Sequence, residues 1–317
     1  MSAITNRYAA LNIVRLTQIR DFVAVVDAGS ISAAARLLGV SQPGLTKSIG
    51  SLEAELAVSL LQRTPRGVSM TRYGRAFYAR ARAAHSELDK AQQELVQMSG
   101  VHSGKVAIGF GPTAAVLVVP RAVQRFREQY PAVELRLLEG FAHALIPLVR
   151  DETLDMTIGP RLPGHRIDPA LQYRPMFHND QTVVVRRGHP RARARSIVEL
   201  ADACWLSFEP RDVMDRALVA LGLPGARQIV QCESLSVMVA LLASTDMLAV
   251  TTRRLLSMLQ AGVALQEVRT VERLAPLTTG LFVRADAPLT PAAAAMAKAL
   301  VDVGRTLPAF EATTTRR

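Results

Sequence analysis

The sequence has 317 residues, of which 49% are hydrophobic, and a formal net charge of +11. This length exceeds that of one average domain, so we expect two or three domains, each with enough apolar residues for a core. The two cysteines, Cys204 and Cys232, have neither CxxC spacing nor neighbouring histidines, which argues against a disulfide framework and a zinc site. Buried thiols in a reducing compartment are expected, with one disulfide between them as the alternative.

The charge distribution indicates the kind of partner. Positive charge points to a polyanion, and its excess per residue is greater before residue 75 than after residue 100. The N-terminal segment MSAITNRYAALNIVRL lacks the apolar core of a secretory signal, and no stretch approaches the apolar length of a membrane span. We therefore expect a cytoplasmic protein with no membrane partner.

The first expected helix covers Leu16 to Ala28 and should support the segment that follows. One face carries the apolar residues Leu16, Ile19, Phe22, Val23 and Val26. Thr17 is the expected cap, and Arg20 and Asp21 should point outward.

Residues 30 to 56 predict two short helices joined by a tight turn. In the first, Ser32 is the expected N-cap. Its apolar stripe consists of Ala33, Ala34, Leu37 and Leu38. Gly39 supplies the positive φ that lets the chain leave this helix and enter the next within a few residues.

The second of these helices is expected to face DNA. Ser41 should cap it, and Pro43 fits its first turn. Its apolar stripe consists of Leu45, Ile49, Leu52 and Leu56. That stripe leaves Gln42, Thr46 and Lys47 pointing outward. This is the helix-turn-helix pattern, in which the first turns of the second helix meet base edges, whereas the alternative is an ordinary helical hairpin with a solvated face.

The next segment, SLLQRTPRGVSMTRYGR, predicts a turn-rich hairpin, or wing. Pro65, Gly67 and Gly74 break helices, while Leu60 and Leu61 can anchor the segment to the core of the helix pair. Its basic and hydroxyl side chains are of the kind that contacts phosphate oxygens. The candidates are Arg63, Arg66, Thr71 and Arg72.

Residues 15 to 100 resemble the N-terminal region of LysR-type transcriptional regulators. The Ser-Gln-Pro opening at residues 41–43 and the Arg-x-x-Arg-Gly wing at residues 63–67 carry the resemblance. It implies a winged helix-turn-helix domain that binds double-stranded promoter DNA. The chain departs from the family at Gly44 and Gly50, and each glycine inside a helix costs about 0.5 to 1 kcal/mol relative to alanine. The expected DNA-binding residues are Ser32, Ser41, Gln42, Pro43, Thr46, Lys47, Arg63, Arg66, Thr71 and Arg72.

A long helix is expected from Thr71 to Ser99. Its apolar residues recur at alternating steps of four and three, which predicts a narrow seam that needs a partner helix. The seam consists of Phe77, Ala81, Ala84, Leu88, Ala91, Leu95 and Met98. Pairing with the same helix of a second subunit is expected, with packing on the helix's own chain as the alternative. In the resembled family this is the linker helix that dimerises, which lets two recognition helices read two half-sites.

Beyond residue 104, strand-like and helical runs alternate, which is typical of doubly wound α/β domains. Strands are expected at 105–109, 133–138, 154–158, 182–185, 205–208, 229–232, 247–250 and 277–283, and helices at 118–129, 142–150, 212–221, 234–243 and 291–307. The resemblance implies a two-lobed domain like a periplasmic binding protein, with crossings near 174–177 and 274–279. The expected division is a winged helix-turn-helix domain at 1–73, a linker helix at 74–100, lobe I at 104–174 and 279–311, and lobe II at 175–278.

An effector is expected between the lobes, on loops after strands and at helix N-termini. The candidates are Thr113, Ala114, Gly140, Phe141, Pro160, Arg161, Phe208, Glu209, Ser234 and Thr251. Each has an alternative, since Thr113 and Ser234 would also serve as helix caps, Phe141 as lobe packing and Arg161 as a solvated charge. By resemblance the effector is a small anionic molecule, often an aromatic one, and Arg161 would suit a carboxylate or sulfonate.

No enzymatic motif is present. The six histidines are scattered without metal-ligand spacing, and GxSxG, GxxxxGK[ST] and a complete GxGxxG are absent, so we expect no catalytic residue, metal or cofactor. A basic cluster at residues 186–195 either touches DNA or another subunit or is a solvated loop.

The expected protein is an effector-responsive transcription regulator that assembles as a dimer or tetramer. RNA polymerase is a further candidate partner. Two alternatives remain, a small-molecule binding protein whose N-terminal helices only mediate assembly, and a DNA-binding protein with a vestigial cleft.

Overall fold

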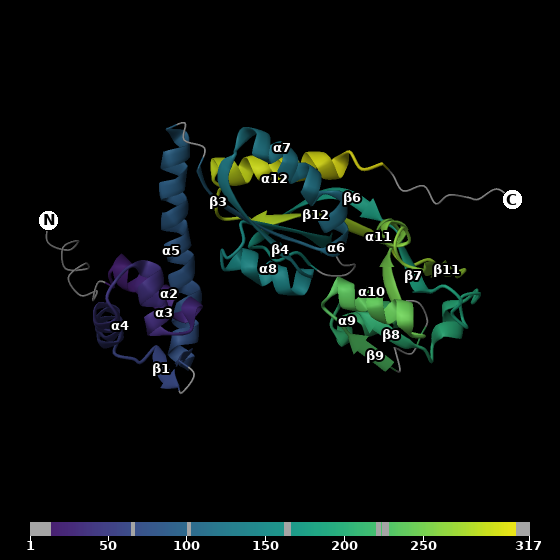
Figure 1. Cartoon of the computed structure of the whole chain (residues 1–317), viewed down its shortest axis with the longest axis horizontal. Helices are drawn as coiled ribbons and strands as arrows, with labels where there is room; N and C mark the ends of the chain where they lie inside the picture. The colour runs from purple at the N-terminus through teal and green to yellow at the C-terminus, as the bar shows by residue number, and fades with distance from the viewer. Residues whose placement is uncertain are drawn as a thin grey trace. The chain divides into compact units, whose positions relative to one another are not determined.

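The computed structural model describes residues 14–64, 67–99, 103–161, 166–219, 223 and 228–308. The side chain of Arg63 also lies outside this description. The chain divides into two compact units between Leu95 and Val96. Figure 1 shows their elements in chain order by colour.

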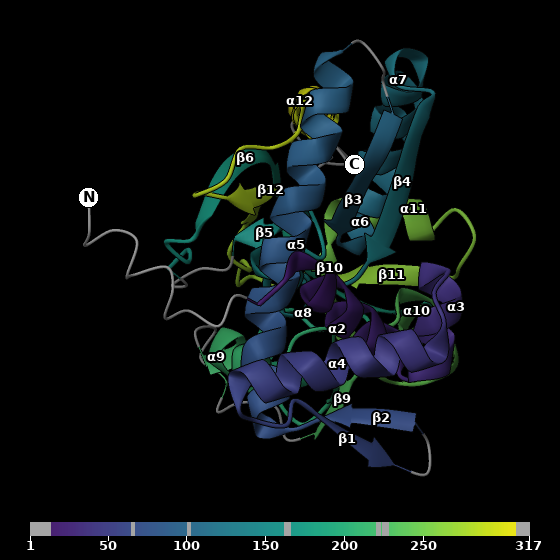
Figure 2. The ribbon, with the colours of Figure 1, turned by 90° about the vertical axis from the view of Figure 1, so that its left-hand side faces the viewer.

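The first unit is a winged helix-turn-helix. Its elements are α2 (Leu16–Ala28), α3 (Ile31–Leu38), α4 (Gln42–Leu56), the antiparallel hairpin of β1 (Leu61–Thr64) and β2 (Gly67–Met70), and α5 (Arg72–Met98), which runs past the division between the units. Figure 2 shows α4 and the hairpin that follows it. Gly39 has a φ of 66°, in the left-handed region, so the predicted turn between α3 and α4 is confirmed.

The core of this unit forms where α2, α3 and α4 meet the start of α5. Leu45, Ile49 and Leu52 of α4 are buried, as the predicted apolar stripe requires, and they pack with Phe22 of α2. Leu60 joins the same cluster, so the segment that follows α4 is anchored as expected. This packing fixes which face of α4 points away from the protein.

Several details of α2 and α3 differ from the sequence-based prediction, and Leu16, predicted on the apolar face of α2, is 59% exposed. Gln18, not Thr17, closes the start of α2, because its Oε1 accepts a hydrogen bond from the Arg15 backbone N–H at 2.7 Å. Asp21, predicted to point outward, is only 6% exposed. Its carboxylate accepts a hydrogen bond from the Ser48 hydroxyl at 2.6 Å, which joins α2 to α4.

In α3 the cap is Ser30, not Ser32, since the Ser30 hydroxyl accepts the Ala33 N–H at 3.1 Å. The buried residues are Ala34 and Ala35, whereas Leu37 is 73% exposed. Each residue turns a helix by about 100°, so a short helix gives few residues from which to fix the buried stripe.

Gly50 lowers the intrinsic stability of α4, although the space around it would admit a larger side chain. A methyl group added at Gly50 would meet no atom within 4 Å, whereas one at Gly44 would lie 2.9 Å from Oγ of Ser41, the helix cap. Gly50→Ala is therefore expected to raise the free energy of unfolding of the winged helix by about 0.5 to 1 kcal/mol. Gly44→Ala is the matched control and should give less, because the capping hydroxyl must move. Urea denaturation measures both, and equal gains would contradict the steric reason.

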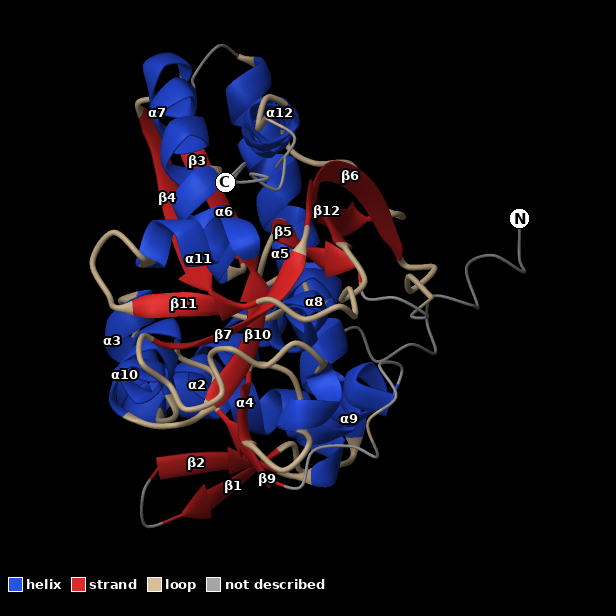
Figure 3. Cartoon of the chain, turned by 90° about the vertical axis from the view of Figure 1, so that its right-hand side faces the viewer, coloured by secondary structure: helices blue, strands red, loops and turns tan. Residues whose placement is uncertain are grey.

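The second unit contains two mixed five-stranded sheets, drawn in red in Figure 3. The first has the order β4-β3-β5-β12-β6 and comprises β3 (Ser103–Phe110), β4 (Ala132–Glu139), β5 (Met156–Arg161), β6 (Leu171–Asn179) and β12 (Leu277–Arg284). The second has the order β11-β7-β10-β8-β9 and comprises β7 (Gln181–Arg186), β8 (Cys204–Ser207), β9 (Gln228–Gln231), β10 (Leu248–Thr252) and β11 (Leu265–Val268). We call the parts built on these sheets lobe I and lobe II.

Helices cover both faces of each sheet. Lobe I has α6 (Pro112–Leu117), α7 (Val119–Gln129), α8 (Ala142–Arg150) and α12 (Pro291–Arg305), with α7 and α12 packed together and α8 on the opposite face (Figure 1). Lobe II has the 3-10 helix η1 (Ile197–Leu200), α9 (Arg211–Val219), α10 (Leu235–Ser244) and α11 (Arg253–Leu259). The predicted two-lobed α/β architecture is thus confirmed.

Each predicted strand and helix overlaps an observed one, and the helix expected at 118–129 corresponds to α7. The elements α6, η1, β6, β11 and α11 are absent from the prediction. The first crossing is also misplaced. Residues 174–177 lie inside β6, and the chain leaves lobe I only after Asn179. β6 was not predicted because exposed residues interrupt its buried ones and because Pro175 lies within it. Its residues therefore do not alternate regularly between buried and exposed.

Candidate functional site

The outward row on α4 is presented as the sequence predicts. Gln42, Pro43 and Lys47 are exposed, and Thr46 is half-buried with its hydroxyl donating to the Gln42 carbonyl at 3.0 Å. The Ser32 hydroxyl lies 3.1 Å from Gln42 Oε1, which accepts from it and so directs the amide N–H groups outward. The N-terminal turns of α4 therefore offer donors of the kind that read purines in the major groove.

The wing contributes fewer described candidates than expected. Arg66 and the side chain of Arg63 lie outside the described residues. Thr71 acts as a cap, since its hydroxyl donates to the Ser59 carbonyl and accepts the Gly74 N–H at 3.0 Å. Arg72 is exposed, with its guanidinium 4.5 Å from the centre of the Tyr73 ring.

The seam on α5 divides into two parts. Phe77 and Ala81 pack into the winged-helix core, with the Phe77 ring 5.5 Å from that of Phe22. Further along, Ala84 and Ala91 are exposed, and Leu88 is 40% and Leu95 69% exposed. Within the described chain, the second part of the seam is thus an apolar stripe left in solvent.

Beside this seam, Tyr78 joins α5 to α2. Its hydroxyl hydrogen-bonds to the Asp27 carboxylate. Burial, together with this bond, raises the pKa of Tyr78 to about 12, so the hydroxyl remains a donor at alkaline pH where a solvated tyrosine ionises.

A cavity of about 470 Å³ lies between the two lobes of the second unit. Most of its lining is apolar, and polar groups come from helix starts, the crossing strands and two arginines. Thr113 on α6 and Thr252, the N-cap of α11, approach within 3.2 Å between their hydroxyl oxygens. Each lobe thus contributes one hydroxyl to this contact.

Aromatic and charged contacts join the lobes at another part of the cavity. Phe141 of lobe I stacks on Phe208 of lobe II, with ring centres 4.4 Å apart. The His143 imidazole lies between two carboxylates of lobe II, 3.6 Å from Glu209 and 3.5 Å from Glu233. These contacts hold the lobes against each other beside the apolar space.

Seven of the ten predicted effector residues line this cavity: Thr113, Ala114, Phe141, Pro160, Phe208, Glu209 and Thr251. Gly140, Arg161 and Ser234 are not among the lining residues. Ser234 caps α10 by accepting the Val237 N–H, which was its alternative role. Arg161 is exposed at the end of β5, the solvated position that was its alternative.

Sequence reasoning missed several polar lining residues. Asn179 and Gln181 flank the first crossing, and Thr279 lies on β12 beside it. Arg216 projects from α9, and Arg273 comes from the loop before β12. Recognition of β6 as a strand would have pointed to Asn179, because ligand groups gather where strands end. No sequence signal marks the two arginines.

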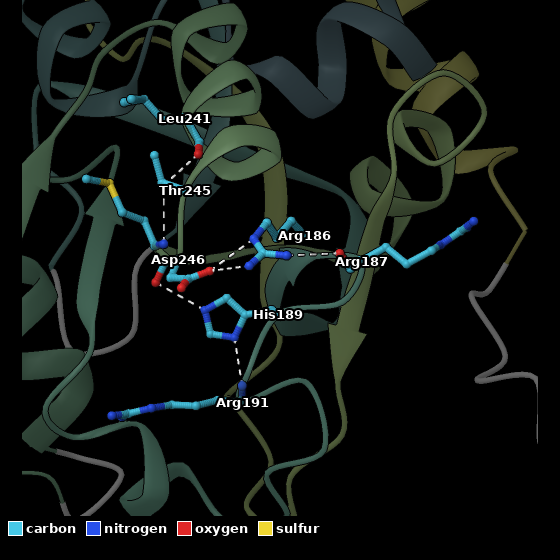
Figure 4. A network of polar contacts seen from close by, with 8 residues as sticks. Arg186, Arg187, His189, Arg191, Leu241, Thr245 and Asp246 are labelled. Carbon is cyan, nitrogen blue, oxygen red and sulfur yellow. Dashed lines mark hydrogen bonds and ion pairs between the residues drawn. The ribbon is translucent and has the colours of Figure 1, made fainter.

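The basic cluster at residues 186–195 is largely tied to its own lobe. Figure 4 shows Arg186 bonded to Asp246, with Nη2 2.6 Å from Oδ1. His189 is buried, and its Nδ1 accepts the Arg191 N–H at 3.0 Å while Nε2 lies 3.1 Å from the Asp246 carbonyl. Arg191 forms two hydrogen bonds with Asp202. These contacts favour a structural role for the cluster over contact with DNA.

Cys204 and Cys232 are free thiols. In the described part of the chain, no group of three or more His, Cys, Asp and Glu residues is arranged to hold a metal ion. None of the described helices combines the length and apolar character needed to cross a membrane.

Comparison with known proteins covers both units. Residues 16–75 match the model of the bacterial regulatory helix-turn-helix protein of the lysR family, and residues 99–305 match the LysR substrate binding domain. The SDS degradation transcriptional activation protein of Pseudomonas sp. (strain ATCC 19151) is 32% identical over 302 residues, which cover 93% of this chain and 98% of that protein. The regulator GbpR of Azospirillum brasilense is 29% identical over 287 residues, covering 88% and 83%.

Solved structures share the fold. A full-length variant of OxyR from Pseudomonas aeruginosa gives a TM-score of 0.68 at 24% identity, covering 92% of this chain and 95% of that one. Full-length CbnR complexed with its target DNA gives 0.60 at 19% identity, covering 91% and 99%. The match at residues 16–75 decides against the alternative in which the N-terminal helices serve assembly alone. The chain belongs to the LysR family and is a DNA-binding transcriptional regulator.

Proposed function

We propose that the N-terminal turns of α4 read promoter bases and that the wing and the start of α5 hold the phosphates. Gln42, Thr46 and Lys47 are the base readers, and Arg63, Arg66 and Arg72 bind the backbone. The observation that supports this is the outward row beside the capped start of α4, with Gln42 oriented by Ser32. Ser41 and Pro43 take part by shaping that start.

We further propose that the exposed part of the α5 seam pairs with a second copy of the chain. A helix with apolar residues in solvent at heptad spacing gains stability by pairing. Pairing would place two α4 helices on two half-sites of one operator. Two such dimers would form a tetramer. We also propose that the assembled regulator contacts RNA polymerase.

The cavity between the lobes is proposed as the effector site. Its apolar lining suits the body of a small molecule, and Arg216 and Arg273 offer positive charge to an anionic end. Effector binding would change the populations of lobe arrangements and so the DNA affinity of the assembly. One relative is named an SDS degradation transcriptional activation protein, and SDS is an alkyl sulfate. Alkyl sulfates therefore join aromatic carboxylates and sulfonates as the candidate effector classes.

A thermal-shift screen of the full chain against these three classes tests the effector site. A compound that binds only the folded protein, at about 100 times its dissociation constant, adds roughly 2.7 kcal/mol of stability. The same compound should alter a DNase footprint on the target promoter. If no anion of these classes binds or changes the footprint, the proposed effector class is wrong.

Arg273→Gln is expected to weaken binding of the compound found in that screen about three- to tenfold. Arg273 is exposed at the cavity, so solvent screens part of its attraction for an anion. Titration calorimetry measures the change, and Arg161→Gln is the matched control, because Arg161 is not among the cavity-lining residues. Equal losses in both variants would mean that the effect comes from overall charge.

A further inference from the structure

The cavity contains a buried amide whose hydrogen-bonding capacity is only partly used. Asn179 is 1% exposed, and its Nδ2 donates to Oγ1 of Thr279 at 3.0 Å. Its Oδ1 has no partner among the described residues, and both residues line the cavity. A buried amide oxygen without a hydrogen bond costs on the order of 1 to 3 kcal/mol. The described residues therefore leave this amide one hydrogen bond short, which a group that enters the cavity can supply.

Several hydroxyl groups at the cavity have their partners within the chain. The Ser207 hydroxyl donates to the Glu209 carbonyl at 2.8 Å and accepts the Glu209 N–H at 3.1 Å. The hydroxyls of Thr113 and Thr252 face each other. Among the described buried side-chain atoms that lack a partner, Asn179 Oδ1 is the one whose residue lines the cavity.

The position of this amide links it to both lobes. Asn179 ends β6 and Gln181 begins β7, so the pair flanks the passage from lobe I to lobe II. Gln181 Nε2 donates to the Ala275 carbonyl at 2.7 Å, beside the return passage that leads into β12. A ligand bonded to Asn179 thus contacts the strands that connect the lobes.

We propose that Asn179, with Thr279 behind it, is a specificity-determining subsite for a neutral hydroxyl or amide group carried by the effector. The inference rests on the proposed function, in which the effector occupies this cavity. A ligand that fills the cavity displaces water from the amide and must replace its hydrogen bond. A hydroxyl or amide group both donates and accepts, so it satisfies either orientation of the Asn179 amide, whereas a methyl group satisfies neither.

Phenol and toluene are the probes, since they share a shape and differ in a hydroxyl against a methyl group. Isothermal titration of the full chain gives the ratio of the toluene to the phenol dissociation constant. Asn179→Leu is expected to lower this ratio about tenfold, because the variant removes the hydroxyl's partner. Thr157→Val is the matched control, as Thr157 is also 1% exposed and its hydroxyl has no partner in the described part of the chain, but it is not among the cavity-lining residues. Its ratio should equal that of the wild type.

The outcomes separate the two claims. If neither probe binds the wild type, the subsite is overturned, whereas the proposed effector site is judged separately by the screen of anions. If both bind and Asn179→Leu leaves the ratio unchanged, or Thr157→Val lowers it equally, the subsite alone is overturned. A crystal structure of the wild type with phenol tests the same claim without a variant. The phenol oxygen should lie about 3 Å from the Asn179 amide, and a hydroxyl directed elsewhere would overturn the subsite.

Discussion

Replacing Leu88 by aspartate is expected to dissociate the assembly and to lower affinity for a two-half-site operator by about a hundredfold or more. Leu88 belongs to the exposed part of the α5 seam. An aspartate there would place a carboxylate in an apolar helix pair, where burial of an unpaired charge is costly. Loss of pairing removes the effective concentration that brings the second recognition helix to its half-site, an effect of about 10² to 10⁴.

Sedimentation velocity and a gel shift on the same promoter fragment measure the two consequences together. Gln92→Asp is the matched control, because it adds the same charge at an exposed position of α5 outside the seam. The control should keep both the assembly and the affinity. An assembled Leu88→Asp variant with wild-type affinity would exclude the seam as the pairing surface.

Replacing Lys47 by alanine is expected to remove most discrimination at one base pair of each half-site, about 1 to 3 kcal/mol. Lys47 is exposed on α4, next to Thr46 and one turn from Gln42, with no ion pair among the described residues. Its ammonium group is therefore free to meet a base-edge acceptor. Binding to unrelated DNA should fall much less, because phosphate contacts dominate it.

Competition gel shifts at fixed salt, with the target promoter against scrambled DNA, measure that discrimination. Lys298→Ala is the control, because it also removes one lysine charge but from α12. Lys298 Nζ lies 3.2 Å from Asp302 Oδ2. Its selectivity should match the wild type. Were Lys47→Ala to weaken promoter and scrambled DNA alike, Lys47 would be a phosphate contact and the base readers would lie elsewhere on α4.

The recognition unit could be read from the sequence because its signals are local. The spacing of Leu45, Ile49 and Leu52 fixes one face of α4, and Gly39 and Ser41 mark the turn and the cap before it. Those residues lie within a few turns of one another, so periodicity and capping chemistry suffice. Where the helix was shorter, as in α3, periodicity and capping chemistry predicted the wrong cap and placed the exposed Leu37 on the buried face.

The sequence by itself determined the outward face of α4 and the alternation of strands and helices, because each depends on contiguous patterns, and its motifs carried the resemblance to the LysR family that implied the two-lobed plan. Only the tertiary structure decided which side chains meet in the cavity. Asn179 and Thr279 lie 100 positions apart along the chain, and their pairing depends on β6 and β12 lying side by side. Arg216 and Arg161 are equally ordinary in the sequence, yet the first lines the cavity and the second ends a strand in solvent. The direction of a side chain follows from the packing of its element against distant segments, and no local pattern encodes that packing.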